Sequence, residues 1–378
     1  MERVLAHTHP VASVLCAISA LFWAAPPALA GPLDRSALSK LESRLRAGDL
    51  GDVHGVVVLQ GGKTVAEWYF PGEDEVRGTP AGVVRFGPDT LHDVRSVTKS
   101  VVGLLFGCAL YDGAIKSLDE PVLDFFPEYP ELRTHERMKI RLRDLLSMTS
   151  GLDWDERTFP YTDPRNSEIA MDAAADRYRY ILSLPIKAEP GTRFDYSGGD
   201  AALVAAVITR ATGEPVDVYA RRRLFSRLGV THLEWLKDGK GIPYAASGLR
   251  LRPDDMARIG QMMLQGGRWK GAQVIPADWI ATATVRHAQI EPDEKCGHEY
   301  GYLWWTINVC ADGKRTPVFF ASGNGGQYIW VAPAEDLVVV STTGMYGSAR
   351  GERAATDILY SVLSAARPDS SLTSPAVP

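Results

Sequence analysis

A serine and a lysine three residues apart, Ser96 and Lys99, are the side chains of this 378-residue sequence best suited to chemistry. A serine hydroxyl is a weak nucleophile until a neighbouring group takes its proton. Residues three apart lie on one face of a helix, so the Lys99 amine can reach the Ser96 hydroxyl. The apolar run at 101–110 would bury this helix and lower the pKa of Lys99, which suits a proton acceptor. The pair therefore predicts a nucleophilic serine whose own N–H, at the helix start, can bind an oxyanion.

The same spacing also fits a serine that caps a helix and a lysine that faces solvent. Two features of the sequence favour the catalytic interpretation. No other lysine of the chain has a serine three places before it, and a strongly apolar helix follows Lys99 directly.

Tyr196 is a second candidate for proton transfer. It lies in the sequence Phe-Asp-Tyr-Ser-Gly-Gly at 194–199, a polar turn that precedes an apolar helix expected at 201–212. A phenol at such a turn would face a cleft. If Lys99 lies nearby, its charge lowers the pKa of the phenol, and a phenolate could relay the proton. The alternative is a tyrosine that only caps the turn.

A third stretch, Ala-Ser-Gly-Asn-Gly-Gly-Gln at 321–327, joins two expected strands. Its small residues would let a substrate approach the strand edge closely. The backbone N–H of Asn324 would then be a second oxyanion donor. The alternative is a glycine-rich hairpin without a functional role.

Other kinds of site are not indicated. No serine has glycine two places before and two places after it, as a nucleophile elbow would require. The net charge of −5 does not suggest a nucleic-acid partner, and neither Cys-x-x-Cys nor His-Glu-x-x-His occurs, so no metal or other cofactor is predicted. His92 precedes the Ser96 helix and is interpreted as structural.

The three stretches stand in the order of the three motifs of the penicillin-recognising serine enzymes, which the chain resembles over roughly residues 50–365. The sequences at 145–152 and 247–257 resemble the class C β-lactamase-like branch, and Gly-Asn-Gly-Gly-Gln is similar to its esterase and 6-aminohexanoate-dimer hydrolase members. The resemblance implies an acyl-serine intermediate and no metal. The roles it implies are a Ser96 nucleophile, proton transfer by Lys99 and Tyr196, oxyanion donors at Ser96 and Asn324, and substrate contacts at Gly198, Ser322, Gly323 and Gly325.

Two departures from the family pattern bear on the substrate. Gly198 stands where Asn is common, and Ala321 stands where Lys or His usually holds a substrate carboxylate. A β-lactam or a D-alanyl-D-alanine peptide should bind poorly unless another cation, such as Arg315, takes over. We therefore expect hydrolysis of a small ester or amide. The alternatives are a β-lactamase or D-alanyl-D-alanine carboxypeptidase, and a non-catalytic protein of this fold that binds cell-wall fragments.

The order of elements predicts an α/β (α+β) fold. Strands are expected at 55–59, 64–70, 302–309, 317–321, 327–332 and 337–343, with a loop at 71–90, helices between 118 and 290, and a helix at 351–366. Short turns between the closing strands favour antiparallel pairing. An antiparallel sheet lobe flanked by helices (31–110 and 291–367), a mostly helical lobe (111–290) and a disordered tail (368–378) are predicted, with the site in the cleft between the lobes.

Residues 1–30 are predicted to be a signal peptide. The stretch 10–30 is almost wholly apolar, and Ala28-Leu29-Ala30 before Gly31 fits a cleavage site. The alternative is an uncleaved anchor, but the two prolines at 26–27 would break a spanning helix. A periplasmic or secreted protein without a membrane anchor after cleavage is expected, in which Cys296 and Cys310 could form a disulfide.

Overall fold

The computed structural model describes residues 31–290, 297–311, 314–368, 370 and 372–373. The predicted signal peptide, Cys296 and most of the predicted tail lie outside these residues. Cys310 is disulfide-bonded, and its predicted pairing with Cys296 stays a prediction. Within the described residues, no helix is both long and apolar enough to span a bilayer.

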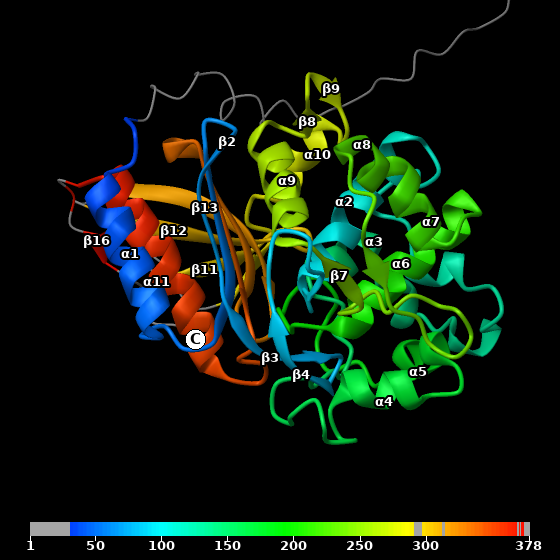
Figure 1. Ribbon diagram of the computed structural model, residues 1–378. Coiled ribbons are helices and arrows are strands. Elements are labelled where there is room, and N and C mark those ends of the chain that lie inside the picture. Colours follow the sequence, from blue (N-terminus) through cyan, green and yellow to red (C-terminus); the bar gives the residue numbers. More distant parts are fainter. Residues whose placement is uncertain (1–30, 291–296, 312–313, 369, 371, 374–378) are drawn as a thin grey trace, which may run out of the picture.

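An antiparallel sheet of nine strands forms the centre of the protein (Figure 1). Its order is β10-β11-β12-β13-β14-β15-β1-β2, and β16 pairs with β12. Both ends of the chain contribute to it, which confirms the predicted fold class. The strands are β1 Val53–Gln60, β2 Lys63–Tyr69, β10 Ala288–Gln289, β11 His298–Tyr300, β12 Trp305–Ala311, β13 Lys314–Gly323, β14 Gln327–Ala332, β15 Leu337–Thr343 and β16 Leu372–Thr373.

The prediction of a loop at 71–90 was wrong. This segment contains an antiparallel hairpin of β3 (Pro71–Val76) and β4 (Thr79–Arg85). Each strand contains a proline and a glycine, β3 is rich in acidic residues, and neither strand shows the apolar alternation that indicates a strand. The remaining strands are short: β5 His92–Asp93, β6 Glu234–Trp235, β7 Leu249–Leu251, β8 Arg268–Trp269 and β9 Ala272–Gln273.

Helices occupy the places expected from the sequence. They are α1 Arg35–Ala47, α2 Val97–Tyr111, α3 Leu142–Leu146, α4 Ser167–Ala173, α5 Arg177–Ser183, α6 Gly198–Thr212, α7 Val216–Ala220, α8 Ser226–Leu228, α9 Pro253–Leu264, α10 Ala277–Ala283 and α11 Ala349–Ala366. Within the region where helices are expected, the segment 167–183 forms two helices, α4 and α5, because Asp176 caps a new helix with its side chain.

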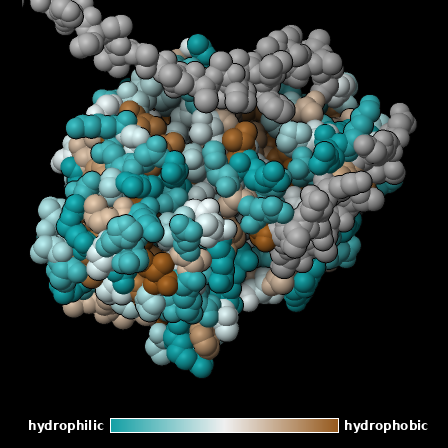
Figure 2. Space-filling view, turned by 180° about the vertical axis from the view of Figure 1, so that it is seen from behind, coloured by the Kyte–Doolittle hydropathy of each residue, from teal (hydrophilic) through white to brown (hydrophobic). Residues whose placement is uncertain are grey.

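The sheet separates two hydrophobic cores. On one face, α1 and α11 lie side by side over the strands (Figure 1). The other face packs against α9, and beyond it lie α2 and the helical region. The side chains of β1 alternate between the two cores. Val56 and Val58 pack in the core on the side of α1 and α11, and Val57 packs in the core on the side of α9. The outer surface seen from behind is mostly hydrophilic, with hydrophobic residues in small groups (Figure 2).

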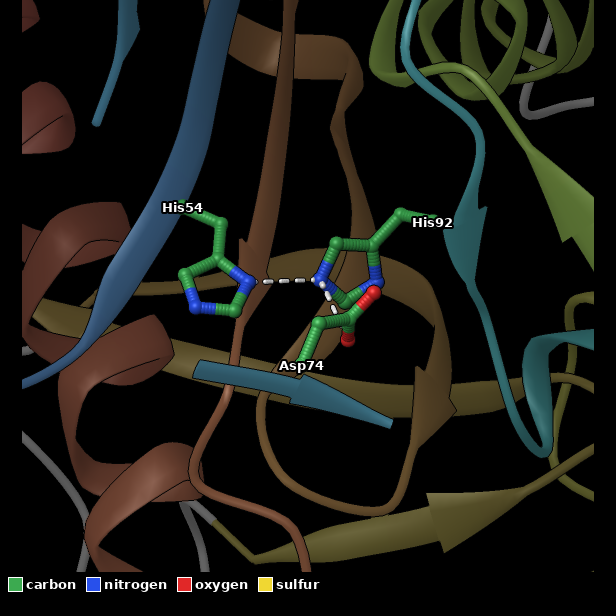
Figure 3. Close-up of side chains that lie close together, drawn as sticks. All are labelled: His54, Asp74 and His92. Carbon is green, nitrogen blue, oxygen red and sulfur yellow. Dashed lines mark hydrogen bonds and ion pairs between the residues drawn. The ribbon is translucent and has the colours of Figure 1, made fainter. Parts of the chain in front are cut away.

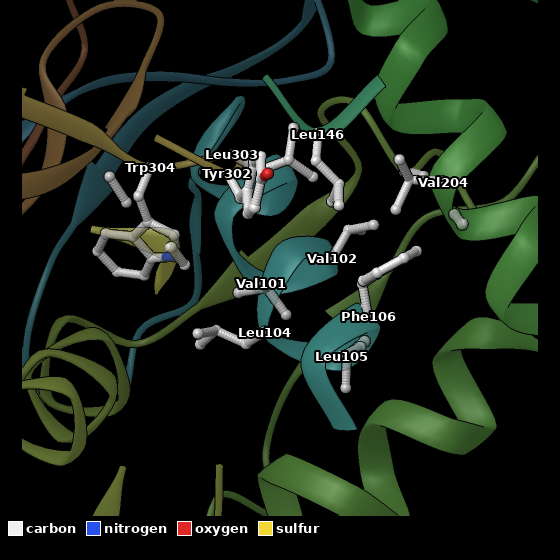
Figure 4. Packing of buried hydrophobic residues seen from close by; sticks show 14 of the residues in the cluster. Val101, Val102, Leu104, Leu105, Phe106, Leu146, Val204, Tyr302, Leu303 and Trp304 are labelled. Carbon is white, nitrogen blue, oxygen red and sulfur yellow. The ribbon is translucent and has the colours of Figure 1, made fainter. Parts of the chain in front are cut away.

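Helix α2 is the element that positions the predicted nucleophile. Every residue from Val97 to Ala109 is buried, so the helix is enclosed on all sides. Figure 4 shows Leu104 on the side of Trp304 and Phe106 on the side of Val204. Complete burial of each such side chain stabilises the fold by roughly 1.5–3 kcal/mol. The start of α2 is therefore held by dense packing, which favours a fixed geometry at Ser96.

Candidate active site

Ser96 lies at the N-cap of α2, and Lys99 follows one turn later. The Lys99 Nζ donates hydrogen bonds to Ser96 Oγ at 2.9 Å and to the carbonyl of Ala246 at 3.1 Å. The Lys99 side chain is buried. Arg95, directly before the serine, has φ of +49°, a left-handed conformation that a non-glycine residue adopts only under constraint from its surroundings. The structure thus brings the first predicted pair together at a strained turn.

Tyr196 reaches the same point from the turn before α6. Its ring centre is 4.8 Å from Lys99 Nζ, and its hydroxyl interacts with Ser96 and Lys99. The rings of Tyr300 and Trp305 pack against it at centroid distances of 6.3 and 5.5 Å. The hydroxyl, amine and phenol of the first two motifs therefore converge.

Two buried carboxylates, Glu156 and Glu168, lie beside Lys99 and have no counterpart in the sequence prediction. Their oxygens are 3.8 and 3.9 Å from Lys99 Nζ. Glu156 lies in the connection between α3 and α4 and Glu168 in the first turn of α4, and neither belongs to a recognised motif. The Tyr161 hydroxyl donates a hydrogen bond to Glu156 Oε1 at 3.2 Å.

The Glu156 carboxylate accepts hydrogen bonds from the Trp154 indole at 2.7 Å and the Gly198 N–H at 2.6 Å. The Glu168 carboxylate accepts one from the Ser247 hydroxyl at 2.6 Å. A buried charge is stable when it is paired and hydrogen-bonded. These contacts hold two buried carboxyl groups directly beside Lys99.

The carboxylates of Glu156 and Glu168 explain why position 198 is a glycine. A Cβ atom there would lie 2.8 Å from Glu168 Oε2 and 3.0 Å from Glu156 Oε2. The space that an asparagine side chain would need is therefore filled by carboxylate oxygens. Because the Gly198 N–H is bonded to Glu156, its predicted substrate contact stays a prediction.

The charges around Lys99 reverse the expectation for its pKa. Burial alone lowers the pKa of Lys99, but the charges of Tyr196, Glu156 and Glu168 more than offset burial and raise it above its ordinary value. The resting lysine is therefore an ammonium, not the neutral base expected from desolvation. Burial raises the pKa of the Tyr196 phenol, and the Lys99 charge opposes this rise.

The third predicted motif lies at the end of β13. A Cβ at Gly323 would be 2.3 Å from the Val94 carbonyl and 3.2 Å from Arg95 Cβ, so this strand end abuts the turn before Ser96. Strand β12 pairs with β13 only as far as Phe320, so 321–323 pair with β14 on one edge and have no strand partner on the other edge among the described residues. That edge could receive an extended substrate.

The other residues of this motif take different positions. Ser322 lies opposite Tyr328 on β14, and its hydroxyl interacts with the Tyr328 phenol. The Asn324 side chain accepts a hydrogen bond from the Gly347 N–H at 2.6 Å, which fixes the loop. Gly325 has φ of +90° and abuts Tyr346, so only glycine fits there without strain. The oxyanion role of Asn324 stays a prediction.

Arg315 does not replace the missing cation at Ala321. It lies on the same strand six residues away, about 20 Å along an extended chain, and pairs with Cys310 at the far end of the sheet. The cation at the mouth of the site is instead Arg157, whose guanidinium lies 5.4 Å from the Tyr196 ring centre. Arg157 is exposed in a loop without a motif, so no sequence pattern indicates this position.

The geometry agrees with comparisons to known proteins. A family model described as Beta-lactamase matches residues 42–362. The chain belongs to this family. It is 27% identical over 308 residues to the 6-aminohexanoate-dimer hydrolase of Paenarthrobacter ureafaciens, covering 75% of this chain and 70% of the relative. The resemblance inferred from the three motifs is thereby confirmed, and the protein is a β-lactamase-related serine hydrolase.

Solved structures of this family share the fold. EstCE1, a hydrolase with promiscuous acyltransferase activity, matches with a TM-score of 0.66 at 17% identity, over 86% of this chain and 98% of that chain. The octameric penicillin-binding protein homologue from Pyrococcus abyssi matches with a TM-score of 0.64 at 18% identity, over 87% and 77%. At these identities the matches establish the fold alone.

Proposed function

We propose that this family member is an exported serine hydrolase that cleaves an ester or a small amide through an acyl-serine intermediate. The observation that carries the proposal is the convergence of Ser96, Lys99 and Tyr196 from two separate segments at the start of a buried helix. A serine beside a phenol that can relay its proton, with a fixed cation next to both, is an arrangement that supports nucleophilic catalysis.

In the acylation step, Ser96 Oγ attacks the substrate carbonyl carbon. The Ser96 proton passes to Tyr196 as the phenol gives its own proton to the leaving alcohol or amine. Lys99 stays an ammonium, because Glu156 and Glu168 hold its charge, and it stabilises the negative charge that develops on the phenol oxygen. The N–H groups of Ser96 and Asn324 bind the oxyanion.

Deacylation follows the same path in reverse. Water takes the place of the leaving group, Tyr196 removes a proton from it, and the proton returns to Ser96 Oγ as the acyl bond breaks. The ammonium of Lys99 again lies beside the phenol, so both steps use one arrangement of charges.

The features of β13 support an ester or linear amide as substrate. Ala321 offers no charge for a carboxylate beside the strand edge, which disfavours β-lactams and D-alanyl-D-alanine peptides. The similarity to a 6-aminohexanoate-dimer hydrolase supports a linear amide as one candidate. Export after cleavage at Ala30–Gly31, to the periplasm or medium, is part of the proposal, and N-terminal sequencing of the secreted protein tests it.

Labelling with a fluorophosphonate tests the nucleophile. The wild-type protein should be labelled and should hydrolyse p-nitrophenyl esters or a linear amide dimer. Ser96→Ala should lose the label and at least about 10⁴-fold in kcat. Ser43→Ala, which changes an exposed serine of α1, should retain both. Label or near-normal turnover in folded Ser96→Ala would exclude the mechanism.

The same assay separates the alternatives. Rapid turnover of a chromogenic cephalosporin, with slow ester hydrolysis, would identify a β-lactamase. A folded wild-type protein that takes no label would indicate a binding protein.

A further inference from the structure

Three buried side chains with metal-ligand atoms meet outside the active site. His54 from β1, Asp74 from β3 and His92 from β5 point toward one another (Figure 3), and one ligand atom of each lies within 4.8 Å of the others. The two histidine side chains are fully buried, and that of Asp74 is 2% exposed. No periodic pattern in the sequence links these residues, because they belong to different strands.

When His54 and His92 are both neutral, at least one of their ring nitrogens has a lone pair that no hydrogen-bond donor satisfies. His92 Nδ1 lies 3.1 Å from the Asp93 carbonyl, which can only accept, so this nitrogen carries the hydrogen and His92 Nε2 is bare. His54 Nδ1 faces that bare nitrogen at 2.9 Å.

Both neutral forms of His54 are then unfavourable. If Nδ1 carries the hydrogen, the buried Nε2 is bare and faces a carboxylate oxygen of Asp52 at 3.4 Å with no donor. If Nε2 carries it and faces Asp52, two bare nitrogens of His54 and His92 confront each other. A cation between the rings removes the conflict, because both lone pairs can then bind it.

We propose that His54, His92 and Asp74 bind a divalent transition metal ion of the zinc type. Two imidazole nitrogens and a carboxylate oxygen form a donor set that suits Zn²⁺. Tetrahedral ligands at about 2.0–2.1 Å from zinc are about 3.3 Å apart. The distances from His92 Nε2 to His54 Nδ1 and to Asp74 Oδ1, 2.9 and 3.9 Å, lie on either side of this value. Small side-chain rotations would close the set, and water would complete the coordination.

The surroundings have the features of a supported metal site. Each imidazole directs its outer nitrogen at an oxygen acceptor, the Asp93 carbonyl or the Asp52 carboxylate, as ligand histidines usually do. The Tyr346 hydroxyl donates to Asp74 Oδ1 at 2.9 Å and so orients the carboxylate. The ring of Phe86 stacks on His54 at a centroid distance of 4.1 Å and covers the site.

Such an ion would tie the β3–β4 hairpin to the main sheet and to β5, which leads into Ser96. The hairpin carries Arg77, whose backbone N–H donates to Asp93 at 2.8 Å and whose guanidinium donates to Ser247 at 2.5 Å. Ser247 in turn donates to Glu168. The ion therefore has a structural role, in which it fixes a hairpin that supports the carboxylates behind Lys99.

The test uses full-length protein without a polyhistidine tag, purified without chelator. Elemental analysis should find about one Zn²⁺ per chain. Removal of the ion with a chelator should lower Tm, and Zn²⁺ at about a hundred times its Kd should raise it by about 3 °C or more. Addition of Co²⁺ to the apoprotein should give visible absorption bands that saturate at about one equivalent.

Asp74→Asn removes the carboxylate but keeps the shape and the acceptor for Tyr346. It should weaken Zn²⁺ and Co²⁺ binding at least tenfold, roughly the loss seen even for second-shell changes. Asp49→Asn, an exposed control on the loop after α1, should bind as the wild type does. Absence of bound Zn²⁺, of a Co²⁺ spectrum and of a Tm rise would show that the imidazoles share only a proton. Equal affinity of wild type and Asp74→Asn would place any bound ion elsewhere. Either result overturns the proposal.

Discussion

Two buried polar clusters lie on opposite sides of the turn that leads into α2, and they differ in the source of their positive charge. In the active-site cluster, Glu156 and Glu168 face Lys99, a cation that the chain itself supplies. In the histidine cluster, Asp74 lies beside two imidazoles whose inner nitrogens face each other at 2.9 Å, and the described part of the chain supplies no fixed cation between them. A buried anion needs compensation in either place.

The difference indicates what each cluster can do. A covalently attached ammonium is always present, so it can stabilise charge in every catalytic cycle. A bound ion or proton can dissociate. The stability of the structure around the histidine cluster therefore depends on the concentration of that ion. The first arrangement suits catalysis, and the second suits a support for the hairpin.

Removal of the Lys99 ammonium should have the largest effect on both stability and kcat. Lys99→Ala leaves Glu156 and Glu168 buried without a counter-charge, so it should lower the free energy of unfolding by about 3–5 kcal/mol. It should also reduce kcat at least about a hundredfold. Stopped assays and chemical denaturation measure the two effects. The exposed variant Lys63→Ala should change neither, and a near-normal kcat for Lys99→Ala would remove the lysine from the mechanism.

Gly198→Asn restores the common family residue but should damage the site. The new side chain must displace the carboxylates of Glu156 and Glu168, at a cost of about 1–3 kcal/mol in stability. We expect kcat to fall by at least about tenfold. A thermal melt and an ester assay test this, with Gly198→Ala as a smaller probe of the same contact. A faster Gly198→Asn enzyme would show that the carboxylates do not fill this space in solution.

Glu156→Gln tests whether the buried carboxylates keep Lys99 in its charged form. The carboxylate raises the pKa of Lys99, so its loss lowers that pKa. Because the ammonium is the active form, activity should be lost at lower pH on the alkaline side, with kcat reduced about tenfold near neutrality. The pH profile of kcat/KM measures the shift. The exposed control Glu67→Gln should leave the profile unchanged, and an unshifted alkaline limb in Glu156→Gln would contradict the role of this carboxylate.

The sequence predicted those parts of the molecule that depend on local patterns. Helix α2 and strands β14 and β15 are apolar runs bounded by turn residues, and two glycines mark the hairpin of β1 and β2. The first two motifs indicated Ser96, Lys99 and Tyr196. The order of motifs also indicated the family and the fold.

What could not be predicted depends on contacts between distant segments. Glu156 lies in a connection and Glu168 at the start of α4, neither in a recognised motif, and only the folded chain shows that they fill the space of the missing asparagine. His54 and His92 have no spacing typical of a metal site, because strands of two different sheets, β1 and β5, bring them together. The lysine pKa was predicted in the wrong direction for the same reason, since desolvation is visible in the sequence but the neighbouring anions are not.

The smallest expected effect concerns Asp172, whose carboxylate holds Arg77 between the two clusters. Burial raises the pKa of Asp172 to about 6, against the opposing charge of Arg77. The pKa of Asp172 is about 6 in the folded protein and near 4 in the unfolded chain, so protonated Asp172 adds to the free energy of unfolding at low pH. This contribution is fully present below pH 4 and is lost as pH rises through 6. From about pH 5 to 8 the free energy of unfolding should fall by about 1 kcal/mol on this account. Urea denaturation at both pH values should show the fall in the wild type and a smaller one in Asp172→Asn, whose amide does not titrate. An equal fall in both proteins would assign the pH dependence to other buried acids and leave Arg77 as a fixed link that does not respond to pH.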